Sequence, residues 1–168
     1  MPYKILVVDD QAVIRNLLKD AFAIGPFEIH TAADAEEALD LLSCNPVDVV
    51  ISDEKMPGMS GTEFLAAVRK RYPETIRIIL TGHASLDTAI RAINEGEIYR
   101  FFTKPCNIVD LRVTVQQALE QRELRQENRR LQRVVARQAR DIQDLERQCP
   151  GITEIRRDAS GAVIIDTE

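Results

Sequence analysis

The first two-thirds of the chain repeat one unit, a short apolar run followed by an amphipathic stretch. The apolar runs cover 4–8, 27–31, 47–52, 76–80 and 98–102. The stretches with helical spacing cover 11–23, 34–43, the region of Phe64, Leu65 and Val68, 85–94, and the chain from about 107 onward. Continuously apolar strands are buried on both faces, and strands that alternate with helices run parallel. The sequence therefore predicts an α/β fold in which helices cover both faces of a five-stranded parallel sheet.

The polar residues that could carry chemistry follow these apolar runs. Asp9 and Asp10 follow the first run, Asp53 the third, Thr81 the fourth and Lys104 the fifth. Ligands of open parallel sheets bind at the carboxyl ends of the strands. We therefore expect these five side chains to lie close together at one edge of the sheet.

The residue types at this edge fit phosphoryl chemistry. Carboxylates that lie close together repel one another unless a cation is present, and ligand sets made only of oxygen suit Mg²⁺. Lys104 offers a compact positive charge to a phosphoryl oxygen, and Thr81 offers a hydroxyl group. Because an Asp carboxylate can accept a phosphoryl group covalently, the sequence predicts a pocket that holds one on an Asp, with Mg²⁺ as cofactor.

Four motifs occur in order along the chain: Val7-Val8-Asp9-Asp10, Ser52-Asp53-Glu54-Lys55-Met56-Pro57-Gly58, Leu80-Thr81-Gly82 and Phe101-Phe102-Thr103-Lys104-Pro105. With these motifs, residues 1–120 resemble the receiver domain of two-component response regulators of the chemotaxis-regulator type. The resemblance implies a flavodoxin-like doubly wound sheet with strand order 2-1-3-4-5. It also implies a partner, a histidine kinase or phosphotransfer protein, that donates the phosphoryl group.

The resemblance implies a role for each residue of the acidic pocket. Asp53 matches the phosphoacceptor and also a metal ligand. Asp10 matches the direct Mg²⁺ ligand, and Asp9 matches the acid that acts on the metal through water. The backbone carbonyl of Lys55 matches a further ligand, and its side chain occupies a position that tunes the lifetime of the phosphoryl group.

The remaining implied roles concern phosphoryl binding and the switch. Lys104 matches the lysine that pairs with the phosphoryl group, and Thr81 the hydroxyl that moves toward it. Phe101 matches the switch aromatic, and His83 a second position that tunes phosphoryl lifetime. Pro105 matches the proline that follows a cis peptide bond.

The last third of the chain changes character, because residues 116–148 contain neither Gly nor Pro. Apolar or amide residues recur there at alternating spacings of four and three: Leu124, Asn128, Leu131, Val135, Gln138, Ile142 and Leu145, followed by Cys149. This heptad repeat predicts that residues 121–149 continue the last receiver helix and form a coiled coil.

The residue types of the seam favour a parallel homodimer, since β-branched Val135 and Ile142 occupy a positions. Asp141 and Glu146 would face each other with like charge in that arrangement, so antiparallel and heteromeric pairing remain alternatives. An acid-free arginine stripe runs beside the seam: Arg129, Arg130, Arg133, Arg137 and Arg140. We interpret this stripe as the solvated outer face of the coil rather than as a nucleic-acid surface.

Residues 150–168 form a tail with two short stretches of strand character, 153–157 and 162–166. They are expected to form a β-hairpin or to begin a further domain. The 27 acidic and 22 basic residues give a net charge of −5, which argues against a general nucleic-acid coat. No apolar run is long enough to span a membrane, no signal peptide is evident, and three scattered cysteines are typical of the cytoplasm.

These observations favour a non-enzymatic signalling protein with, at most, slow autodephosphorylation. One alternative is a dimeric scaffold that works without phosphorylation. A second is an aspartyl-phosphate hydrolase of the haloacid-dehalogenase kind, which requires an Asp two residues after the nucleophile, where this chain has Lys55.

Overall fold

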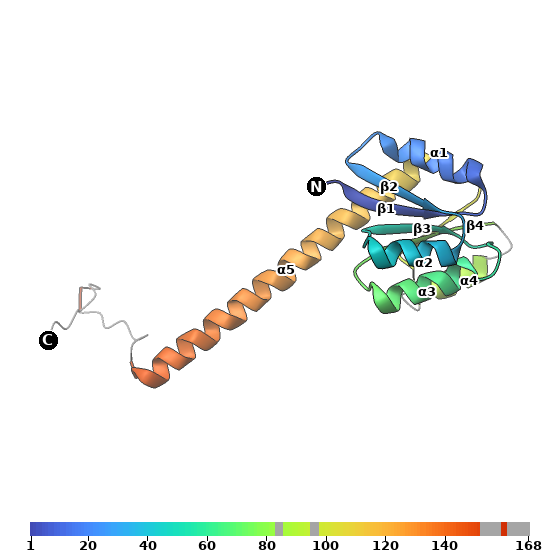
Figure 1. Ribbon diagram of the computed structural model, residues 1–168. Coiled ribbons are helices and arrows are strands. Elements are labelled where there is room, and N and C mark those ends of the chain that lie inside the picture. Colours follow the sequence, from blue (N-terminus) through green and yellow to red (C-terminus); the bar gives the residue numbers. More distant parts are fainter. Residues whose placement is uncertain (83–85, 95–97, 152–158, 161–168) are drawn as a thin grey trace. The chain divides into compact units, whose positions relative to one another are not determined.

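The computed structural model describes residues 1–82, 86–94, 98–151 and 159–160, in which strands and helices alternate (Figure 1). The strands are β1 (Tyr3–Val8), β2 (Phe27–Ala32), β3 (Val49–Asp53), β4 (Ile76–Thr81) and β5 (Arg100–Thr103). The helices are α1 (Ala12–Ala23), α2 (Ala35–Cys44), α3 (Gly61–Arg71), α4 (Leu86–Asn94) and α5 (Ile108–Gln148). The order of elements agrees with the prediction, and their boundaries differ from it by one or two residues.

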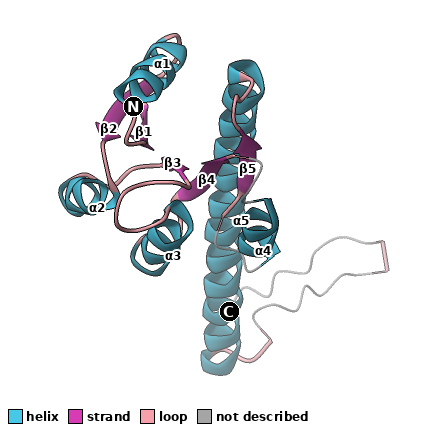
Figure 2. Cartoon of the chain, turned by 90° about the vertical axis from the view of Figure 1, so that its right-hand side faces the viewer, coloured by secondary structure: helices cyan, strands magenta, loops and turns pink. Residues whose placement is uncertain are grey.

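The strands form one parallel sheet in the order β2-β1-β3-β4-β5 (Figure 2). Val8 pairs with Ser52 across β1 and β3, and Asp53 pairs with Leu80 across β3 and β4. The predicted α/β fold and its strand order are therefore confirmed. The chain changes winding direction between β1 and β3, and ligands of doubly wound sheets bind at such a point.

Alternate residues of each strand enter two separate cores, one on each face of the sheet. Ile5 of β1 joins Phe22 of α1 and Leu111 of α5 in one core. Leu6, the next residue of β1, joins Phe64 of α3 in the other core, which α2 and α4 complete. Burial of each such side chain contributes about 1.5–3 kcal/mol, so both helical layers fix the sheet that carries the strand ends.

Two helices near the strand ends begin at side-chain caps. The carboxylate of Asp34 accepts a hydrogen bond of 2.8 Å from the backbone N–H of Glu37 at the start of α2. Ser60 and Glu63 form a capping box at the start of α3, in which each side chain accepts from the other residue's backbone N–H. These caps fix where the loops after β2 and β3 end.

β3 and β5 each begin two residues later than their apolar runs predict. Val47 and Ile98 are buried, but they lie outside the strand ladder. The carbonyl of Val47 accepts from the Thr75 hydroxyl at 3.0 Å, and the N–H of Ile98 donates to the Ala92 carbonyl at 3.3 Å. A buried residue next to a strand is apolar whether or not it pairs in the sheet. The apolar run in the sequence is therefore longer than the strand.

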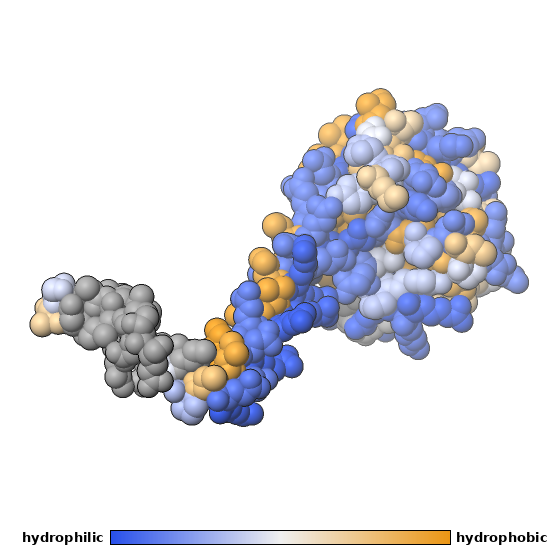
Figure 3. Space-filling model, turned by 60° about the vertical axis from the view of Figure 1, so that its left-hand side comes forward, coloured by the Kyte–Doolittle hydropathy of each residue, from blue (hydrophilic) through white to orange (hydrophobic). Residues whose placement is uncertain are grey.

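The helix α5 is continuous over 41 residues, as the sequence predicts. The chain divides into two compact units, Met1–Arg122 and Glu123–Glu168. In the first unit α5 buries its inner face, whereas in the second its apolar side chains are exposed (Figure 3). Those exposed by half or more are Leu124 (72%), Leu131 (54%), Val135 (63%), Ile142 (52%) and Leu145 (50%).

The coiled-coil pairing of this helix stays a prediction, and the expected strands 153–157 and 162–166 lie outside the described residues. Among the helices that the structure describes, none has a stretch long and apolar enough to cross a lipid bilayer.

Candidate functional site

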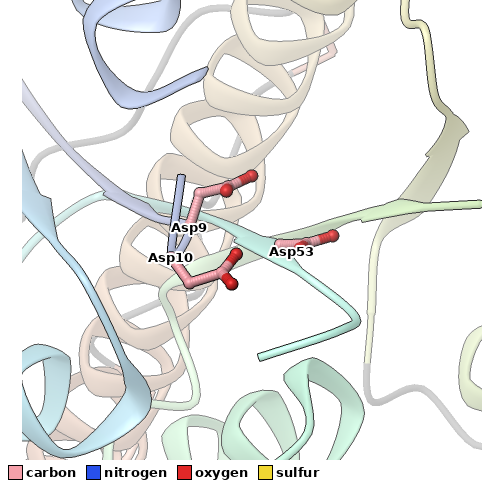
Figure 4. A group of neighbouring side chains, drawn as sticks. All are labelled: Asp9, Asp10 and Asp53. Carbon is pink, nitrogen blue, oxygen red and sulfur yellow. The ribbon is translucent and has the colours of Figure 1, made fainter. Parts of the chain in front are cut away.

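Three aspartates meet where β1 and β3 end (Figure 4). Asp9 and Asp10 directly follow β1, and Asp53 is the last residue of β3. One carboxylate oxygen from each residue lies within 4.8 Å of the other two. Three carboxylates at this separation repel one another, so the arrangement favours a bound cation.

The two neighbouring aspartates differ in their surroundings. Asp9 is fully buried, and both of its oxygens are engaged. Its Oδ1 accepts from the Gln11 backbone N–H at 2.9 Å, and its Oδ2 accepts from Lys104 Nζ at 2.8 Å. Asp10 is exposed and lines a shallow depression together with Glu54, Lys55 and residues of the loop before α3. Asp10 is therefore the carboxylate of this pair that is open to solvent and to an incoming ligand.

Lys104 connects the acids of two strands. Its ammonium group lies 2.8 Å from Asp9 Oδ2 and 3.1 Å from Asp53 Oδ1, with the side chain 25% exposed. Its backbone N–H donates to the Thr81 carbonyl at 2.8 Å, which holds the end of β5 beside β4. The peptide bond between Lys104 and Pro105 is cis, as the resemblance implies.

The electrostatic balance of the pocket shows in two pKa values. Burial raises the pKa of Asp53 above its ordinary value, and the hydrogen bond and charge of Lys104 only partly offset this effect. Burial alone would lower the pKa of Lys104, but its hydrogen bonds to Asp9 and Asp53 outweigh burial and raise that pKa. Lys104 therefore remains a cation. Further positive charge near Asp53 would stabilise its ionised form.

The remaining residues singled out in the sequence lie around this centre. Thr81 ends β4 and is fully buried, and its hydroxyl donates to the Gly82 carbonyl at 3.1 Å. Phe101 of β5 is half-buried against the core of α2, α3 and α4. Lys55 is exposed, and its backbone N–H hydrogen-bonds the Asp53 carboxylate. His83 lies outside the described residues, so its tuning role stays a prediction, as do the switch roles of Thr81 and Phe101.

Two residues that support the pocket were not found by the sequence analysis. Arg15 of α1 donates through Nη1 to the backbone carbonyls of Asp9 at 2.6 Å and Asp10 at 3.2 Å. Glu54 accepts through Oε2 from the backbone N–H of Thr62 at 2.9 Å and from its hydroxyl at 2.7 Å. No signal in the sequence distinguishes Arg15 from any other charged residue of an amphipathic helix.

Comparison with known proteins gives a consistent result. The family profile described as "Response regulator receiver domain" matches residues 5–116. The hydrogenase transcriptional regulatory protein HoxA of Cupriavidus necator is 38% identical over 127 residues, which cover 76% of this chain and 26% of HoxA. The chain thus spans about a quarter of the length of the curated relatives it matches.

Two solved structures show the same likeness. The signal receiver domain of an HD domain-containing protein from Pseudomonas fluorescens is 42% identical, with a TM-score of 0.69, and the match covers 73% of this chain and 98% of that one. A structure described as an adenylate cyclase from Rhodopirellula baltica is 34% identical, with a TM-score of 0.73 and coverage of 79% and 98%.

Proposed function

Because the chain belongs to the family of response regulator receiver domains, we propose that it is the phosphoacceptor of a two-component phosphorelay. In this proposal a histidine kinase or a phosphotransfer protein donates the phosphoryl group, and Asp53 accepts it with the help of Mg²⁺. The resulting change passes through α4, β5 and α5 to a dimeric coiled coil. The chain acts as a signalling protein, and any loss of the phosphoryl group by its own hydrolysis is slow.

One observation carries the proposal: Lys104 bridges Asp9 and Asp53 across three strand ends, with Nζ–O distances of 2.8 and 3.1 Å. A single ammonium group placed between two buried carboxylates neutralises part of their charge. The same group lies where an oxygen of a phosphoryl group on Asp53 would need a positive partner.

The proposed step is a transfer between two nucleophiles. An oxygen of Asp53 attacks phosphorus of a phosphohistidine, and an acyl phosphate bond forms while the P–N bond breaks. The electron pair of that bond stays on the histidine nitrogen, which can then take up a proton. Lys104 stabilises the negative charge on the phosphoryl oxygens during the transfer, and the Lys55 N–H positions the attacking carboxylate.

The acidic residues fit a magnesium ion. Asp10 and Asp53 offer hard oxygen ligands within 4.8 Å of each other, and Asp10 is open to solvent for the waters that Mg²⁺ retains. Asp9 already binds Lys104 and the Gln11 N–H, which supports a role through water rather than direct ligation. The Lys55 carbonyl completes the proposed ligand set. When bound, Mg²⁺ would neutralise charge on the attacking carboxylate and on the phosphoryl oxygens.

The proposed output uses the second unit of the chain. We assign residues 1–120 to the receiver, 121–149 to a dimerising helix and 150–168 to a tail of open role. Exposed apolar side chains at a and d positions support pairing, because an unpaired helix that exposes such a seam invites association. Movement of Thr81 and Phe101 would alter the face of β5 and α5 and so the geometry of the helix.

The proposal places the chain in the cytoplasm, in keeping with cysteines that are free among the described residues: Cys44, Cys106 and Cys149. A scaffold that works without phosphorylation is a second candidate, because the coil could pair whatever the state of Asp53. The haloacid-dehalogenase alternative receives no support from the site, since Lys55 stands where that chemistry needs an Asp.

Intact mass after incubation with acetyl phosphate and Mg²⁺ tests the proposal, with Asp53→Asn as the matched control. We expect one phosphoryl adduct on the natural chain and none on Asp53→Asn. Oligomer size, read on the same samples by light scattering, shows whether the adduct alters the coil. If no adduct is found at any time from seconds after mixing onward while Mg²⁺ binding is confirmed, the phosphoacceptor role is wrong and the scaffold role gains support.

A further inference from the structure

One arginine marks the end of the receiver unit on the long helix. Arg122 is the last residue of the first compact unit, which spans Met1–Arg122. Its side chain is only 16% exposed. From Glu123 to Leu145 every residue of α5 is exposed. Arg122 is therefore the last largely buried side chain of the helix before that exposed stretch begins.

The guanidinium of Arg122 binds the segments that lead into two strands. Its Nη2 lies 2.6 Å from Asp48 Oδ1 and its Nη1 lies 3.2 Å from the Asp48 carbonyl. The same Nη1 approaches the Glu74 carbonyl at 3.5 Å. Asp48 immediately precedes β3, and Glu74 lies two residues before β4. The arginine thus contacts the sheet at the amino ends of its strands.

Asp48 is itself hydrogen-bonded to the sheet, so it does not move together with the helix. Its Oδ2 accepts from the Lys4 backbone N–H at 2.7 Å, and its own N–H donates to the Lys4 carbonyl at 2.8 Å. Its carbonyl also accepts from the Ile76 N–H at 2.9 Å. The Arg122–Asp48 ion pair therefore connects α5 to β1, to the segment before β3 and to β4.

The Arg122–Asp48 pair differs from the Arg130–Glu127 pair farther along the helix. Arg130 lies 3.5 Å from Glu127, and these side chains are 76% and 54% exposed, so water screens that pair. Arg122 and Asp48 are 16% and 30% exposed and come from positions 74 residues apart. An arginine that is partly buried and makes several short hydrogen bonds restricts the rotation and translation of its helix far more than a solvated ion pair does.

We propose that Arg122 and Asp48 anchor the long helix at the edge of the sheet opposite the Asp53 pocket. The first residue of α5, Ile108, follows closely on Lys104, and about 21 Å of helix separates it from Arg122. With Arg122 anchored, the segment of α5 between Ile108 and Arg122 answers a displacement near the pocket by tilting about Arg122 rather than by sliding. Arg122 is thus a positioning residue for the helix that carries the output, and this part rests on the proposed function.

The anchor itself is tested without any phosphoryl donor. Spin labels on the natural Cys44 and on Gln121→Cys, in a chain with Cys106→Ser and Cys149→Ser, report the intrachain distance between α2 and the turn of α5 that carries the anchor, both within the first unit. Excess unlabelled chain suppresses signals between protomers. We compare the parent with Arg122→Met, which keeps the aliphatic stem, and with Asp48→Asn, which keeps an acceptor for the Lys4 N–H.

Arg112→Met is the matched control, because Arg112 also lies on α5 but donates only to the Ile24 carbonyl at 2.9 Å among the contacts described. We expect one narrow distance distribution for the parent and for Arg112→Met, and a broad one for both anchor variants. Unchanged distributions in the anchor variants, or equal broadening in Arg112→Met, would overturn the proposal. Phosphoryl uptake by intact mass on the same variants separates failure of the anchor from failure of the phosphoacceptor role.

Discussion

Gly61, the first residue of α3, lies directly against the backbone of Asp53. A Cβ atom on Gly61 would overlap with the Asp53 carbonyl oxygen and stand 2.9 Å from both the Asp53 carbonyl carbon and the Glu54 Cα. The Gly61 N–H also donates to the Glu54 carbonyl at 3.0 Å. The start of α3 therefore lies so close to the Asp53 backbone that only a residue without a side chain fits there.

Gly61→Ala is expected to displace the Asp53 backbone and to slow phosphoryl uptake, because the reacting oxygen must stay aligned with its partners. We expect a loss of about tenfold or more in the initial rate with acetyl phosphate. Gly82→Ala is the matched control, since no atom of the described residues lies within 4 Å of its added Cβ. Equal rates for the two variants would show that this close approach does not position Asp53.

Lys104→Met is expected to destabilise the chain in the absence of divalent ions. The change leaves Asp9, which is fully buried, and Asp53, which is 5% exposed, without their cation. We expect a loss of about 2 kcal/mol in the free energy of unfolding, below the value for a fully buried pair because Lys104 is 25% exposed.

Mg²⁺ should stabilise Lys104→Met more than the natural chain, because the metal replaces part of the missing positive charge. Urea unfolding with Mg²⁺ and with EDTA measures both effects, and Lys70→Met, which removes an exposed lysine of α3, is the control. Equal stability of Lys104→Met and Lys70→Met in EDTA would contradict the bridging role assigned to Lys104.

Local patterns predicted the elements of this fold well because each strand and helix leaves a periodic signal. The five strand-end residues were also available from the sequence, since a parallel sheet brings the carboxyl ends of its strands to one edge. The strand order itself came from the resemblance. The late starts of β3 and β5 were not predictable, because Val47 and Ile98 are buried without joining the ladder.

Individual contacts that depend on how the chain folds back on itself left no such signal. Arg122 and Asp48 are separated by 74 positions, and neither departs from what an exposed helix or a loop would contain. The approach of Gly61 to Asp53 depends on how the loop after β3 folds back, which spacing does not encode. Arg15 reads as one more charged residue of an amphipathic helix until its carbonyl partners are known.

Val135→Lys is expected to weaken self-association without unfolding the receiver. Val135 is 63% exposed in the single chain, so its replacement costs the monomer little. In a dimer the change removes two buried apolar side chains, which weakens association by about 3 kcal/mol, or roughly a hundredfold in Kd. Sedimentation equilibrium measures this change, and Arg133→Gln on the outer face should leave it unaltered. An unchanged Kd for Val135→Lys would exclude the heptad seam.

Cys149 reports the direction of the helices in that dimer. Its N–H donates to the Leu145 carbonyl at 2.8 Å, so it continues the helical spacing past the end of α5. In a parallel dimer the two thiols face each other across the axis, within reach of a disulfide. In an antiparallel dimer about 37 Å of helix, the length from Leu124 to Cys149, separates them.

Mild oxidation is therefore expected to give a covalent dimer on a non-reducing gel. Cys149→Ser should abolish that dimer, and Cys44→Ser, which removes the other exposed thiol, should not. A covalent dimer that depends on Cys44 alone would indicate random collision rather than a parallel coil.

Cys106 should react with alkylating agents more slowly than the other two cysteines, and only at higher pH. Burial raises the pKa of its thiol, and a nearby backbone N–H and the charge of Lys104 offset this only in part. Because the thiolate is the reactive form, a raised pKa lowers the thiolate fraction at pH 8 and shifts the increase in labelling rate to higher pH.

Cys44 and Cys149 are exposed and serve as internal references for iodoacetamide labelling followed by peptide mass analysis. Labelling of Cys106 at the rate of Cys44 across the whole pH range would contradict its burial beside the pocket.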